Sequence, residues 1–77
     1  MFPTYRKLNE KCFFKIHDLS HFEELKIMGN RYLFTVVKVS QLPEKIYFQD
    51  VLESGLVITE VEYQNKLFDC KLNLKII

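Results

Sequence analysis

Four side chains in this 77-residue sequence are of the types that bind zinc: Cys12, His17, His21 and Cys70. Structural zinc sites take four nitrogen or sulfur ligands and usually supply them as two closely spaced pairs. The two histidines have a suitable spacing, but each cysteine is isolated and there is no Cys-x-x-Cys pair. We therefore predict no metal site and no cofactor, and interpret both cysteines as small buried hydrophobic residues. A Cys12–Cys70 disulfide would require neighbouring strands and an oxidising compartment.

Residue types used in nucleophilic catalysis occur together at Asp18, Ser20 and His21. Neighbours in a turn rarely converge as a triad, and a helix-capping role explains Ser20 with fewer assumptions. The paired carboxylates fall where helices are expected to begin and would oppose the helix dipole there, at Glu23, Glu24, Glu60 and Glu62. The two glycines cannot form a phosphate-binding loop. We therefore predict that the chain is not an enzyme.

Charge is balanced overall but segregated along the chain. Eleven basic residues stand against ten acidic ones, for a net charge of +1, which excludes a strongly basic nucleic-acid arm. Residues 1–17 carry four basic side chains and one acidic one, whereas residues 46–62 carry four acidic side chains and no basic one. Such a distribution allows a positive edge of one copy to meet a negative edge of another, or of a partner protein.

The first segment also interleaves aromatic and basic residues. Lys11, Phe13, Lys15 and His17 alternate with Cys12, Phe14 and Ile16, so they share one face of an expected strand. Sheets that bind single-stranded nucleic acid stack nucleobases on aromatic rings, and basic side chains beside these rings contact the phosphates. A strand covered by a helix, with lysine stems at its edge, gives the same pattern. These four residues are the candidate binding residues.

Periodicity predicts the elements of the N-terminal half. Residues 4–17 are expected to form a hairpin, and residues 31–40, rich in β-branched and aromatic side chains, a central strand covered on both faces. Between them, the Ser20 and Glu23 capping-box spacing and apolar residues at every third position favour a helix over 21–28 that ends at Gly29. The alternative is a strand with Leu25 and Ile27 inward.

The C-terminal half is less uniquely patterned. Residues 44–54 fit a helix beginning at Pro43, but the hairpin length of 41–45 favours a strand over Lys45–Phe48 that pairs with 31–40. Residues 56–58 are expected to form a short buried strand. Thr59 and Glu62 have capping-box spacing and predict a helix over about 60–70. Residues 68–76 alternate between apolar and polar types, which predicts a terminal strand. The helix and the strand are compatible if the helix ends near Leu67.

The expected fold is a single α+β domain over residues 1–77. It combines a small, mostly antiparallel sheet (N-terminal hairpin, central strand 31–40 and C-terminal strand) with one or two short helices. An oligonucleotide-binding barrel is a minority alternative, since such barrels use more glycine. Apolar runs are far too short to span a bilayer, so we expect a cytoplasmic protein with no membrane association. The predicted function is a non-catalytic interaction module that binds a protein or itself. The alternative is weak single-stranded nucleic-acid binding.

Overall fold

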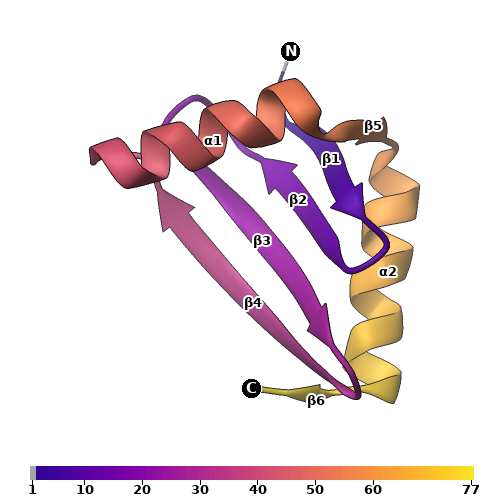
Figure 1. Ribbon diagram of the computed structural model, residues 1–77. Coiled ribbons are helices and arrows are strands. Elements are labelled where there is room, and N and C mark those ends of the chain that lie inside the picture. Colours follow the sequence, from indigo (N-terminus) through magenta and orange to yellow (C-terminus); the bar gives the residue numbers. More distant parts are fainter. Residues whose placement is uncertain (1) are drawn as a thin grey trace.

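A computed structural model describes residues 2–77 (Figure 1). Six strands form one sheet in the order β5-β1-β2-β3-β4-β6. All neighbouring strands are antiparallel except β4 and β6, which run parallel. The strands are β1 Thr4–Asn9, β2 Cys12–Ile16, β3 His21–Met28, β4 Arg31–Lys38, β5 Leu56–Ile58 and β6 Lys75–Ile76; the helices are α1 Leu42–Ser54 and α2 Glu60–Asn73. The expected α+β class with a mostly antiparallel sheet is confirmed.

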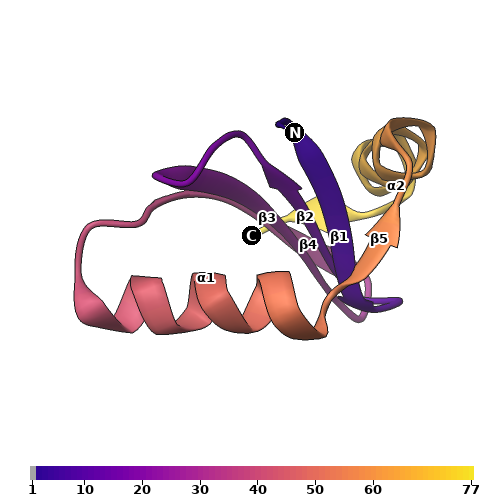
Figure 2. The same cartoon turned by 90° about the horizontal axis from the view of Figure 1, so that it is seen from above.

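The two helices cover opposite faces of the sheet, as Figure 2 shows in a view along its edge. On the α1 face, Phe48 and Val51 of the helix pack with Phe14, Ile16 and Phe22 of the strands. The α2 face has a second cluster, in which Tyr63 and Cys70 meet side chains from five strands: Tyr5, Phe13, Leu25, Tyr32 and Ile58. Because both faces are covered, a central strand buries successive residues and shows no simple alternation.

The hairpin at 4–17 is confirmed, and residues 31–38 form the expected strand β4. The central position expected for this strand is wrong, because among the described strands β4 has only the two-residue β6 on its outer side and is half-buried or exposed over most of its length. Residues 21–28 form a strand and not the expected helix. Phe22 and Leu25 suggest a helical stripe by their spacing, yet in a strand an odd spacing sends them to opposite faces, where each is fully buried. Gly29 has φ +63° and opens the two-residue loop that joins β3 to β4. It therefore serves a hairpin turn and not a helix end.

The strand favoured over Lys45–Phe48 is wrong as well, because these residues belong to helix α1. Pro43 lies in the first turn of α1, and the Gln41 amide donates to Glu44 Oε1 at 3.3 Å. Phe48 and Val51 then project to one side, where Phe48 stacks on Phe22 with ring centroids 5.6 Å apart. Burial of this face stabilises the helical alternative.

The strand over 56–58 is confirmed, but its expected burial is wrong: β5 lies at the sheet edge, and Leu56 and Val57 are 62% and 74% exposed. The helix from residue 60 is confirmed, and Thr59 caps α2 by accepting from the Glu62 amide at 3.0 Å. The helix does not end near Leu67 but continues to Asn73, because Cys70 and Leu74 pack into the same cluster as Tyr63. The C-terminal strand is confined to Lys75–Ile76. Neither helix in the described part of the chain has the length and apolar character that crossing a bilayer requires.

Candidate interaction surface

Of the four residues singled out for binding, Phe13 and Lys15 lie in β2 on the sheet face that α2 covers, whereas Lys11 lies in the turn before β2 and His17 just after the strand ends. Phe13 is only 1% exposed and belongs to the α2-side cluster, with Lys66 Nζ of the helix 5.6 Å from its ring centroid. Lys15 Nζ lies 6.0 Å from the Tyr5 ring centroid, and His17 Nε2 lies 2.7 Å from Glu23 Oε2. Phe13 therefore has no ring surface free for a base, and the arrangement is the helix-covered strand with lysine stems at its edge.

The charge segregation seen along the chain is offset in part by the fold. β5 pairs with β1, so the acidic segment lies beside the basic N-terminal segment. Lys7 Nζ is 2.7 Å from Glu10 Oε1 and 3.3 Å from Glu62 Oε2, and the Tyr5 hydroxyl donates to Glu60 Oε2 at 3.0 Å. Lys7 is thus neutralised within its own chain. Because Lys7 is paired within the chain, it does not contribute to an attraction between oppositely charged edges of two copies.

The zinc-binding side chains do not converge. Cys12 packs on the α1 face, whereas Cys70 is buried under the opposite face and both thiols are free. The imidazole rings of His17 and His21 stack at 4.8 Å, each beside a carboxylate, with Asp18 Oδ1 3.1 Å from His21 Nδ1. No cluster of three or more ligands suited to a metal occurs within residues 2–77.

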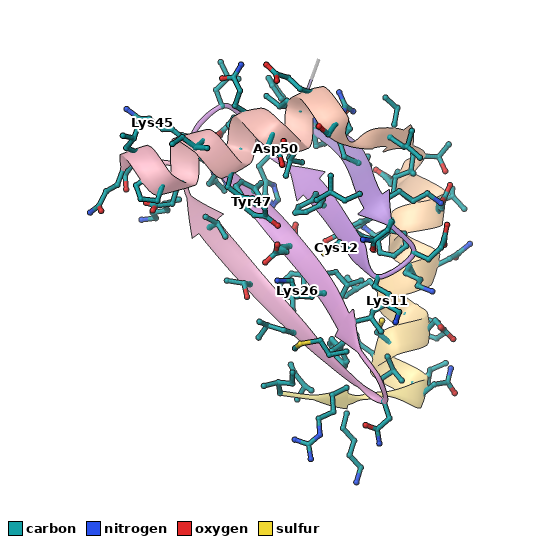
Figure 3. The ribbon with its side chains drawn as sticks, in the orientation of Figure 1. Lys11, Cys12, Lys26, Lys45, Tyr47 and Asp50 are labelled. Carbon is teal, nitrogen blue, oxygen red and sulfur yellow. The ribbon has the colours of Figure 1, made fainter. Side chains whose placement is uncertain are left out.

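A group of titratable side chains that the sequence did not suggest lies between α1 and the sheet. Tyr47 reaches from α1 to donate a hydrogen bond to Glu24 of β3, a carboxylate only 9% exposed. Cys12 and Lys26 are partners in the β2–β3 ladder and lie on the same face (Figure 3). A carboxylate, a phenol, a thiol and an amine therefore meet at the open end of this face.

The protonation of this group argues against nucleophilic chemistry. Burial raises the pKa of the Cys12 thiol, and the neighbouring Glu24 carboxylate raises it further, against the opposing effect of Lys26. Burial and the hydrogen bond to Glu24 raise the pKa of Tyr47 as well. The thiolate is the reactive form of cysteine, and here the thiol is held protonated at neutral pH. The Glu24–Tyr47 pair instead satisfies a buried carboxylate and fastens α1 to the sheet.

The least expected surface is the outer side of α2. Val61, Phe68 and Leu72 are 66%, 63% and 67% exposed, and their spacings of seven and four place them on one stripe. That stripe points away from the sheet, opposite Tyr63 and Cys70, which are fully buried on the inner side. Figure 2 shows α2 nearly end-on, lying on the opposite side of the sheet from α1. We call Val61, Phe68 and Leu72 the α2 stripe.

Charge is arranged asymmetrically along the same helix. Its first turn carries Glu60 and Glu62, and its last turn carries Lys71. Glu60 and Lys71 are eleven residues apart, about three turns, so both flank the α2 stripe on the same side. Isolated exposed apolar residues are ordinary, but three large apolar side chains aligned on one side of a helix with charged ends are typical of an interface.

The sequence already contained the signal for this stripe, since Val61, Phe68 and Leu72 recur at helical spacing once residues 60–73 are taken as a single helix. Comparisons of the chain with protein-family models, with curated proteins and with solved structures find no match.

Proposed function

We propose that the chain is a non-catalytic interaction module that self-associates through the α2 stripe. The observation that supports this proposal is a helix apolar on both sides, with the inner side in the core and the outer side uncovered. In water a helix of this kind stabilises itself by burying its second face against another apolar surface. A second copy offers a surface of the same size and chemistry.

Antiparallel packing of two α2 helices fits both the apolar residues and the charges. A twofold axis near the middle of the stripe sets Val61 of each copy against Leu72 of the other and brings the two Phe68 rings together at the centre. The same arrangement brings Lys71 near Glu60 of the other copy, and it opposes the two helix dipoles. Parallel packing would instead align the acidic first turns.

Charge exchange tests this geometry. Lys71→Glu should weaken the dimer, and adding Glu60→Lys should restore it, since the pair is then re-formed with reversed signs. Sedimentation equilibrium over a concentration series measures both changes. Lys45→Glu on α1, outside the stripe, is the control for altered net charge, since it lowers the net charge by the same amount as Lys71→Glu. A double variant as weak as Lys71→Glu alone would contradict antiparallel packing, and a wild-type chain that stays monomeric at millimolar concentration would contradict the proposal itself.

The nucleic-acid alternative is the weaker proposal because Phe13 is buried and cannot stack a base. It is tested with a fluorescent single-stranded oligonucleotide, whose anisotropy should not change at physiological salt. A cytoplasmic location is part of the proposal, since reducing compartments keep thiols such as Cys12 and Cys70 free.

A further inference from the structure

In the part of the chain that the structure describes, the outer edge of β4, on the side away from β3, has no paired strand over most of its length. β3 pairs with all of β4, from His21 opposite Lys38 to Met28 opposite Arg31. On the other side, β6 pairs only with Arg31 and Tyr32. Figure 1 shows the remainder of β4 as the outermost long strand. Within residues 2–77, no ladder covers the edge from residue 33 to residue 38.

Two hydrogen bonds establish which backbone groups point outward. The Ile77 amide donates to the Tyr32 carbonyl at 2.9 Å, so the polar groups of Tyr32 face the β6 side. The Val39 amide donates to the Ser20 carbonyl at 2.7 Å, toward the β3 side. Backbone groups alternate along a strand. The outward amides and carbonyls are therefore those of residues 34, 36 and 38.

Charge indicates what this edge accepts. β4 carries Arg31 and Lys38 at its two ends and no acidic residue, and Lys75 of β6 adds a third positive charge. On the adjoining strand, Glu23 is paired with His17, and Glu24 accepts the hydrogen bond from Tyr47. Pairing β4 with its own copy would only add like charges at both ends, which is destabilising. An extended segment with acidic residues at its ends is complementary.

We propose that the open edge of β4 binds an acidic, extended peptide segment of a partner protein by strand addition. Main-chain hydrogen bonds to residues 34, 36 and 38 supply affinity, and Arg31 and Lys38 select acidic residues. The side chain of Val36, 57% exposed, gives the peptide an apolar contact beside these bonds. This site lies on a different element from the α2 stripe and does not depend on self-association.

The test uses the full chain and a short fluorescent peptide in which Val and Thr alternate and Glu occupies both ends. Its anisotropy should rise on binding, and the affinity should fall at least tenfold when Lys replaces Glu in the peptide. Val36→Pro removes an outward amide while leaving the β3 ladder intact, because proline is tolerated at an edge where its nitrogen faces solvent. We expect at least a tenfold loss with Val36→Pro and little change with Val36→Thr, which keeps the amide.

Amide hydrogen exchange of the wild-type chain gives a second readout that requires no variant. Bound peptide should slow the exchange of residues 34, 36 and 38 and leave residues 33, 35 and 37 unchanged, since the latter already donate toward β3. Equal binding of the Lys peptide, protection without this alternation, or no binding at millimolar peptide would each overturn the inference. A monomeric chain that still binds the peptide would refute self-association and leave the β4 site intact.

Discussion

Truncation of Phe68 at the centre of the α2 stripe should dissociate the dimer without harming the fold. The ring is 63% exposed in the single chain. Full burial of a phenylalanine side chain is worth about 1.5–3 kcal/mol, so each ring contributes about 1–2 kcal/mol when the interface covers it. The dimer contains two such rings, and Phe68→Ala therefore removes about 2–4 kcal/mol. This corresponds to a dissociation constant roughly 30- to 1,000-fold weaker.

Sedimentation equilibrium of wild type and Phe68→Ala over the same concentration range measures this ratio. Ile46→Ala on α1 is the matched control, because Ile46 is 61% exposed but lies outside the stripe. The folded monomer should be unaffected by Phe68→Ala, since alanine favours helix by about 0.5 kcal/mol over phenylalanine at an exposed position. Equal dissociation constants for wild type and Phe68→Ala, or an equal loss with Ile46→Ala, would refute the interface.

Three further predictions concern the fold. Hydrogen bonds from the side chain and backbone of Ser20 lower the pKa of Asp18 to about 2, so the ionised Asp18 stabilises the fold fully above about pH 4 and this stabilisation is lost as the pH falls toward 2. Asp18→Asn should therefore reduce the change of the urea midpoint between pH 4 and pH 2, and a change as large as that of the wild type would contradict this role of Asp18. The buried Tyr63 hydroxyl has no hydrogen-bond partner among the described residues, so Tyr63→Phe should raise the free energy of unfolding by about 1 kcal/mol in denaturant titrations, whereas a decrease would reveal a partner. A Cβ at Gly55 would overlap the Val51 carbonyl, so Gly55→Ala should lower the free energy of unfolding by about 1–3 kcal/mol, and an unchanged thermal midpoint would contradict this contact.

Local patterns predicted several of the elements. The N-terminal hairpin and β4 followed from alternation and composition, and α2 followed from the Thr59 cap. The helix predicted for residues 21–28 was wrong because β3 is a central strand that buries residues toward both helices, and the resulting spacing of apolar residues resembles that of a helix. The Gly29–Asn30 pair between two apolar runs was the missed hairpin signal.

The α2 stripe was missed for a related reason. Residues 68, 70, 72 and 74 are all apolar and alternate with polar residues, which indicates a strand. In the helix, Phe68 and Leu72 form the outer side, and Cys70 and Leu74 lie on the inner side. An apolar pattern on two opposite sides of one helix produces alternation over a short window. The packing of Cys70 against the sheet decides between helix and strand, and a local sequence pattern contains no information on that packing.

The Glu24–Tyr47 pair could not be predicted either. Its partners are 23 residues apart and meet only because α1 crosses the sheet above β3. The pattern places Glu24 at the start of an expected helix, and Tyr47 lies in the segment 44–54, which fits both a helix and a strand. Contacts of this kind depend on how the elements pack, and no spacing in the sequence encodes them.

Isotope-filtered nuclear Overhauser spectroscopy on a mixture of labelled and unlabelled chains tests the self-association most directly. Antiparallel packing predicts contacts between copies from the Val61 methyls to the Leu72 methyls, together with contacts between the two Phe68 rings. Contacts between copies that involve other surfaces only, or none at a concentration where wild type sediments as a dimer, would contradict the account.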